Sequence, residues 1–169
     1  RPAAGLRRVS PEVPTLKSYS WSGLRVDSPL VLKDLQPWHG QSGPGDGVQL
    51  SIGDVPIHLP GARRVDDRQQ LSGSDYLFHR AEVASYRVSA GQRITMAPEG
   101  GASQAALLAF LMGRPFAALA CQRGWLSLHG GCFQAGAGGA VIAAAAGTGK
   151  STLLAALQAS MPPTSIICA

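Results

Sequence analysis

The sequence predicts an α/β chain in two parts, in which a small, mostly β N-terminal lobe precedes a core with a mainly parallel or mixed sheet. Apolar and polar residues alternate over residues 48–52 and again over 84–96, which is typical of strands. Leucines at helical spacing begin after Gly100-Gly101. A strand, a glycine-rich loop, a helix and another apolar run then follow one another over residues 140–168, as in a βαβ unit.

These patterns divide the 169 residues into three segments. Residues 1–15 contain three prolines and no periodicity, so we expect a flexible basic arm. Residues 16–100 form the β-rich lobe and residues 101–169 the second domain. Within the lobe we expect strands over 48–52 and 55–59, a hairpin made by 84–88 and 94–96, and a glycine-rich loop over 41–47.

The second domain begins with a helix for which Ser103 is a suitable N-cap. Pro115 is expected to break this helix, whose second half continues to Gln122. We then expect a short strand over 125–129 with a continuation over 132–134, and a buried strand over 140–143. A helix over 150–159 that ends before Pro162-Pro163 and a strand over 165–168 are expected to follow. The chain begins with Arg1 rather than Met and stops inside an apolar run, so we expect a fragment that is truncated at its C-terminal end.

The amino-acid composition argues against several classes of protein. Hydrophobic residues make up 45% of the chain, enough for a core, and charged residues 15%. Three widely spaced cysteines without a CxxC pair argue against a disulfide framework or a structural zinc site, and no leader pattern is visible, so a cytoplasmic location is expected. The most apolar stretch, 105–121, is interrupted by Gly113-Arg114-Pro115, so no membrane span is expected.

The formal net charge is +5, and five of the fifteen basic residues fall within the first 25 positions. Such an arm can contact an acidic partner, but a solvated terminus is the simpler interpretation. The basic residues are not interleaved with aromatic ones, so the pattern does not favour a nucleic acid as the partner.

The segment 144–152, Ala-Ala-Ala-Gly-Thr-Gly-Lys-Ser-Thr, carries the chemistry. It matches the end of the phosphate-binding loop pattern G-x-x-x-x-G-K-[ST] and lies between a predicted strand and a predicted helix. Gly147 and Gly149 let the backbone turn its N–H groups into one concavity, at the positive end of the following helix dipole. Lys150 supplies a charge for the β- and γ-phosphates of ATP. The Ser151 hydroxyl can ligate Mg²⁺, and Thr152 can add a hydroxyl near the α-phosphate.

One position departs from that pattern, because Ala144 stands where the first glycine is usual. A β-carbon there could crowd the loop and weaken phosphate binding. The alternative to a functional loop is a glycine-rich turn in an alanine-rich sequence.

A second motif lies upstream, where Leu128-His129-Gly130 precedes the loop by one predicted turn and one strand. Together with the loop, this arrangement resembles the catalytic domain of HPr kinase/phosphorylase and its relatives among the protein and peptide serine kinases. The resemblance covers about residues 103–169. It implies a P-loop core that binds ATP and Mg²⁺ through Gly147, Thr148, Gly149, Lys150, Ser151 and Thr152.

The resemblance also implies roles in catalysis. Lys150 would act on the transferred phosphate, and His129 would lie close to that phosphate and to its acidic partner. The family's catalytic Asp follows the strand after the loop's helix, so it is expected beyond residue 169. A histidine in a turn with a satisfied hydrogen bond remains the alternative for His129. Members of the family often assemble, so a homo-oligomer stays open.

The other polar residues give weaker evidence for a metal site or a catalytic site. His39, His58 and His79 lack the spacing of metal ligands, and Asp66-Asp67 and Asp75 are expected in a solvated polar loop. No G-x-S-x-G supports serine hydrolase chemistry, and Cys132 is expected to be a small buried residue rather than a nucleophile.

The sequence therefore predicts an ATP-dependent serine kinase that transfers the γ-phosphoryl group of ATP to a serine hydroxyl of a protein or peptide. The first alternative is a non-catalytic module with a degenerate loop that binds a nucleotide or a partner. The second is a P-loop ATPase that associates with nucleic acid through the basic arm. The sequence does not identify the phosphoacceptor or say whether phosphorolysis occurs.

Overall fold

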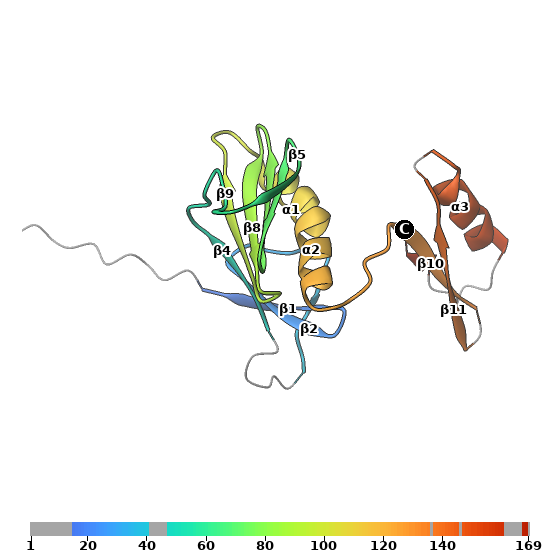
Figure 1. Cartoon of the computed structure of the whole chain (residues 1–169). Helices are drawn as coiled ribbons and strands as arrows, with labels where there is room; N and C mark the ends of the chain where they lie inside the picture. Colours follow the sequence, from blue (N-terminus) through green and yellow to red (C-terminus); the bar gives the residue numbers. More distant parts are fainter. Residues whose placement is uncertain (1–14, 41–46, 136, 146, 161–166, 169) are drawn as a thin grey trace, which may run out of the picture. The chain divides into compact units, whose positions relative to one another are not determined.

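The computed structural model describes residues 15–40, 47–135, 137–145, 147–160 and 167–168. The chain divides into unit 1 (Arg1–Trp125) and unit 2 (Leu126–Ala169) (Figure 1). It is a mixed α/β protein with a large sheet that contains parallel and antiparallel pairs. The predicted arm lies outside the described residues except for residue 15, and so does the predicted loop over 41–47 except for Gly47.

The described part of unit 1 contains a nine-stranded sheet in the order β3-β1-β2-β4-β9-β8-β7-β6-β5. Its strands are β1 (Lys17–Trp21), β2 (Leu24–Ser28), β3 (Gln36–Pro37), β4 (Val48–Ile52), β5 (Arg63–Asp66), β6 (Gln69–Ser72), β7 (Asp75–Arg80), β8 (Ala84–Ser89) and β9 (Arg93–Pro98). β4 pairs in parallel with β2 and β9. The other pairs are antiparallel. The lobe is thus β-rich, as predicted.

Two of the expected strand features are present and one is absent. The strand over 48–52 forms as β4, and β8 and β9 form the expected hairpin around Ala90-Gly91. Both turn residues have positive φ, +51° and +63°, which suits a tight hairpin turn. The strand expected over 55–59 was wrong, because this segment forms a loop. Pro56 cannot donate a hydrogen bond to a ladder, which disfavours a strand there.

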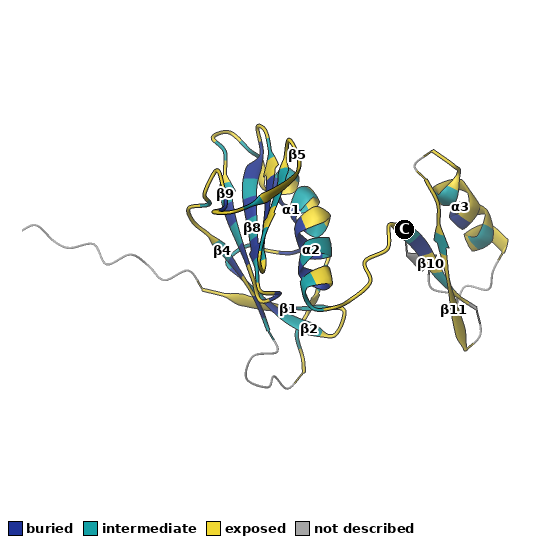
Figure 2. Cartoon of the chain, viewed as in Figure 1, coloured by how far each residue is buried: buried dark blue, intermediate teal, exposed yellow. Residues whose placement is uncertain are grey.

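The helices α1 (Gln104–Met112) and α2 (Arg114–Gln122) match the predicted broken helix. The Ser103 hydroxyl accepts a hydrogen bond from the Ala106 amide at 3.2 Å, which confirms the N-cap. Leu107, Leu111, Phe116 and Leu119 are buried in the same core cluster as the inward-facing residues of the sheet (Figure 2). The Tyr86 hydroxyl adds a hydrogen bond to the Leu107 carbonyl at 2.9 Å.

This packing corrects the predicted domain boundary. The sequence change at residue 100 marks the start of helices that complete the β-rich unit, and the compact units meet after Trp125 instead. The physical reason is that one face of the sheet needs an apolar cover, which α1 and α2 supply.

Among the described residues, one helical stretch, Gln104–Gln122, is long and apolar enough by composition to span a membrane. Gly113 separates its two halves, and its buried leucines belong to the core of unit 1. A core role therefore explains its apolar character. The absence of a membrane span stays a prediction.

Unit 2 contains β10 (Gly130–Ala135), β11 (Gly138–Ala143), α3 (Lys150–Ser160) and β12 (Ile167–Cys168). The strand order is β11-β10-β12, and both neighbouring pairs are antiparallel. The sequence predicted a βαβ unit in a mainly parallel or mixed sheet, whereas the neighbouring strands of this small sheet pair antiparallel. β11 and β12 do run in the same direction, but β10 lies between them. Residues 125–129 form no strand, which corrects a second expectation, because the ladder begins only at Gly130. The expected continuation over 132–134 does lie within β10.

Candidate phosphate-binding site

The predicted phosphate loop connects a strand to a helix within unit 2. β11 ends at Ala143 and α3 begins at Lys150, and the described residues between them form no helix or strand. Ala146 lies outside the described residues. Leu154, on the second turn of α3, is 3% exposed and anchors the helix in unit 2, where α3 packs on β10. A short loop, residues 144–149, therefore connects the end of β11 to the first turn of α3.

The two loop glycines adopt the left-handed backbone conformation, with φ of +80° at Gly147 and +89° at Gly149. A β-carbon at either position would meet no atom within 4 Å. The need for glycine is therefore conformational rather than steric. An alternation of ordinary and left-handed residues turns successive N–H groups toward one side, which is how backbone concavities bind anions.

The Lys150 ammonium folds back over the start of the loop. It donates hydrogen bonds to the carbonyls of Ala144 and Ala145, at 2.8 and 2.9 Å. The Thr148 hydroxyl donates to the Ala145 carbonyl as well, at 2.8 Å. These three bonds link the two ends of the loop and hold the cation beside its backbone.

Ala144 fits this arrangement. Its side chain is exposed, and the non-glycine residues with positive φ in the described part of the chain are Ser22, Glu82 and Ala90. Ala144 therefore does not need the conformational freedom of glycine. It contributes its carbonyl to Lys150, and a β-carbon does not interfere with that bond.

Ser151 and Thr152 lie in the first turn of α3, and both are exposed. Their hydroxyls form no hydrogen bond with the described residues. They are available on the surface at the end of the helix that carries the partial positive charge of its dipole.

His129 lies beside the start of the loop because of the strand register. It directly precedes Gly130, whose partner across the ladder is Ala143, and Ala144 follows at once. His129 is exposed, and no described residue hydrogen-bonds to it. Gly130 is required by space, because an added β-carbon would lie 2.6 Å from the Ile142 carbonyl oxygen. Sequence and structure therefore bring His129, Lys150 and the loop into one region.

Lys150 supplies the charge of this region. Lys150 is the only Lys, Arg, Asp or Glu in the sequence of unit 2, so no carboxylate of that unit neutralises it. In the part of the chain that the structure describes, no three His, Cys, Asp or Glu side chains come together as a metal site would require. Among the side chains of residues 147–152, the oxygen atoms that could bind a cation are the hydroxyls of Thr148, Ser151 and Thr152, of which Ser151 is the predicted ligand.

The other candidate residues, which are cysteines, aspartates and histidines, differ in exposure and in their contacts. Cys121 and Cys132 carry free thiols and are exposed, so the expectation that Cys132 is buried was wrong. Asp66 and Asp67 are exposed as expected, but Asp66 ends β5 rather than lying in a loop. The pKa of Asp66 is lowered chiefly by a hydrogen bond from the Arg68 amide. Asp75, expected in a loop, instead begins β7 and forms an ion pair with Arg87 at 2.8 Å. His58 and His79 line a pocket in unit 1 that sequence reasoning missed.

The chain was compared with protein-family models, curated proteins and solved structures. No family model, curated protein or solved structure matches it.

Proposed function

We propose that the loop over residues 144–152 binds the phosphates of Mg-ATP, and that the chain is part of an ATP-dependent serine kinase of the HPr-kinase-like group. One observation carries the proposal: two left-handed glycines lie between an ordered strand and a helix whose first residue is Lys150. This combination supplies backbone donors, a helix dipole and a positive charge at one point.

The groups present suit a phosphate chain. Backbone N–H groups and the α3 terminus favour anions, and the Lys150 ammonium has no carboxylate partner in unit 2 that would compete for it. Mg²⁺ binds proteins through few ligands and completes its shell with phosphate oxygens and water, so a single Ser151 hydroxyl is compatible with it. When bound, the ion would neutralise charge on the β- and γ-phosphates.

The chain's own residues would act by position and charge. The loop amides would orient the phosphates, and Lys150 would stabilise negative charge on the transferred group. His129 directly precedes β10, whose first residue pairs with Ala143 at the start of the loop, and there it would be close to that group. The resemblance would assign the base that accepts the serine proton to an Asp, and the sequence of unit 2 contains no Asp or Glu. The acceptor would be a serine-bearing protein or peptide.

Calorimetry with Mg-ATP tests the binding step. We expect a dissociation constant in the micromolar range, or about −8 kcal/mol, and a loss of at least a hundredfold in affinity in Lys150→Ala. Lys150→Gln keeps hydrogen-bond donors but removes the charge, so an equal loss in that variant identifies charge as the cause. Lys33→Ala, an exposed lysine of unit 1, is the control and should bind normally. Unchanged binding by Lys150→Ala would overturn the proposal.

A non-catalytic nucleotide-binding module is the second candidate, and one observation favours it: the sequence of unit 2 contains no Asp or Glu. Transfer of the labelled γ-phosphoryl group of ATP to serine peptides distinguishes the two. The kinase predicts transfer that Lys150→Ala abolishes, whereas Ser151→Ala mainly raises the Mg²⁺ concentration that is needed. Tight Mg-ATP binding without any transfer by the full protein would favour the binding module.

A further inference from the structure

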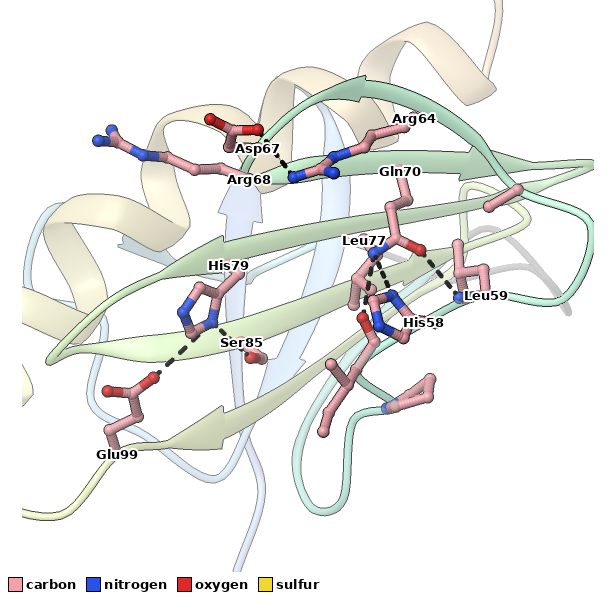
Figure 3. Close-up of a pocket in the computed structure, with 13 residues that line it drawn as sticks. His58, Leu59, Arg64, Asp67, Arg68, Gln70, Leu77, His79, Ser85 and Glu99 are labelled. Carbon is pink, nitrogen blue, oxygen red and sulfur yellow. Dashed lines mark hydrogen bonds and ion pairs between the residues drawn. The ribbon is translucent and has the colours of Figure 1, made fainter.

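A pocket of about 630 Å³ lies on one face of the nine-stranded sheet of unit 1 (Figure 3). On β7, Tyr76 and Phe78 belong to the same core cluster as the buried residues of α1 and α2, so Leu77 between them faces the other side of the sheet. Leu77 is 3% exposed and Leu59 is 5% exposed, and both line the pocket. The pocket therefore has an apolar floor on the face opposite the two helices.

One wall of the pocket is an irregular segment that hydrogen bonds attach to β6. The Gln70 side-chain amide accepts a hydrogen bond from the Leu59 backbone amide and donates one to the Ile57 carbonyl, both at 3.0 Å. The Ser72 hydroxyl donates to the Pro60 carbonyl at 2.6 Å. The wall is thus held at three backbone positions without a ligand, as is usual for small-molecule sites.

Two arginines line this pocket, but neither directs a free positive charge into it. The Arg64 guanidinium is paired with the Asp67 carboxylate at 2.7 Å, so these two charges neutralise each other. Figure 3 shows the Arg68 guanidinium extending away from Leu59 and Leu77. An anionic ligand on the apolar floor would therefore find no cationic partner.

Glu99 is the other carboxylate of the lining. Its Oε2 accepts a hydrogen bond from the Glu82 backbone amide at 2.7 Å. Its Oε1 lies 3.7 Å from Nδ1 of His79, which is too long for a hydrogen bond, and the same nitrogen lies 3.1 Å from the Ser85 hydroxyl. Oε1 therefore has no hydrogen-bond donor among the described residues. A protonated His79 would be the one cationic group of these residues within ion-pair distance of Glu99.

We propose that this pocket binds an amphipathic amine, an organic cation with an apolar body and a primary ammonium group. The ammonium group, which has three N–H donors, donates to Oε1 of Glu99, and the apolar body lies on Leu59 and Leu77. The volume is within the range of ligand pockets, roughly 300–1,000 Å³. A metal ion fits less well, because no three His, Cys, Asp or Glu side chains come together in the part of the chain that the structure describes.

The probes for this site are naphthylmethylammonium and its neutral N-acetyl derivative, which share one apolar ring system. In an NMR titration of the full chain, the ammonium compound should shift the amide signals of residues 77–79 and 99 to saturation. It should bind about tenfold more tightly than the acetyl derivative, because only the cation gains a charge-assisted hydrogen bond. Equal affinities of the two compounds, or tighter binding of the anion naphthylacetate, would refute the proposal.

A matched pair of variants tests the carboxylate. Glu99→Gln removes the charge but keeps an oxygen that can accept from the Glu82 amide, so the fold should persist. This variant should bind the ammonium probe about tenfold more weakly and the acetyl derivative as the wild type does. Glu82→Gln removes an exposed charge outside the lining and should bind both compounds normally. An equal loss in both variants, or none in Glu99→Gln, would contradict the assignment.

A second pair of variants tests the apolar contact. Ile57 is 82% exposed at the rim, so Ile57→Ser should leave the core intact and weaken both compounds severalfold. Val65 is 51% exposed on β5 and lies outside the lining, so Val65→Ser should bind both compounds normally. Signal changes confined to unit 2, or equal losses in the two variants, would show that the probes bind elsewhere.

Discussion

The Asp75 carboxylate accepts three hydrogen bonds from two residues of unit 1. It accepts hydrogen bonds from the Arg87 guanidinium at 3.2 and 2.8 Å and from the Ser89 hydroxyl at 2.6 Å. The Asp75 side chain is 25% exposed and that of Arg87 40%, so solvent screens the pair in part. We expect Asp75→Asn to lower the free energy of unfolding of unit 1 by about 1 kcal/mol, measured by urea denaturation at neutral pH.

The effect of Asp75→Asn on the free energy of unfolding should depend on pH. The Arg87 hydrogen bonds lower the pKa of Asp75, with Ser89 adding to the effect. A carboxyl whose pKa is lower in the folded state stabilises the fold above its unfolded pKa of about 3.9, and the stabilisation is lost as the pH falls through the folded value. The difference between the wild type and Asp75→Asn should therefore shrink below about pH 4. Asp54→Asn, an exposed control, should show little effect at any pH; a constant difference for Asp75→Asn would contradict the assignment.

At the scale of elements, the β10–β11 hairpin fixes where the loop and His129 lie. Gly130 and Gly139 are both in this hairpin, but a β-carbon at Gly130 would lie 2.6 Å from the Ile142 carbonyl oxygen, whereas at Gly139 the nearest atom is 3.9 Å away. We expect Gly130→Ala to separate the strands next to the loop and to weaken Mg-ATP binding at least tenfold. Gly139→Ala, at the far end of the hairpin, should bind normally. Equal affinity of the two variants would show that the hairpin does not position the site.

The same elements show what sequence could predict. The strand before the loop and the helix after it were predicted because an apolar run and the G-K-S-T segment are local signals. The expectation that this strand is buried was wrong, because β11 is largely exposed in the described part of the chain. The strands expected over 55–59 and 125–129 were wrong, although apolar and polar residues alternate in both segments. Such alternation indicates a preference for the extended conformation, but it does not show that a neighbouring strand is present to pair with. In the first, Gln70 and Ser72 bind the backbone as a ladder would have done. No local sequence pattern indicates these hydrogen bonds between β6 and the loop, so the pocket in unit 1 could not be predicted.

For the whole molecule, the boundary after Trp125 separates units of very different core content. The main core cluster lies entirely in unit 1, whereas Leu154 is the one buried large apolar side chain among the described residues of unit 2. The sequence placed the boundary at residue 100 because composition changes there, but α1 and α2 belong to the sheet that they cover. Unit 2 is small for an independent fold, and ligand binding should contribute much of its stability.

The tryptophans allow that expectation to be tested in the intact chain. Trp21, Trp38 and Trp125 all belong to unit 1, so their fluorescence reports the unfolding of that unit alone. Mg-ATP at a hundred times its dissociation constant should add about 2.7 kcal/mol to the stability of unit 2, because a ligand that binds only the folded state shifts unfolding by mass action. Hydrogen exchange of α3 amides should slow accordingly, while the tryptophan transition stays unchanged.

Lys150→Ala should show neither change, since it lacks the charge that holds the phosphates. A shift of the tryptophan transition by Mg-ATP in the wild type would mean that unit 1 binds the nucleotide or unfolds together with unit 2. Slowed exchange in Lys150→Ala would mean that the loop binds ATP without its lysine. Either result would separate nucleotide binding from the loop geometry on which the proposed kinase depends.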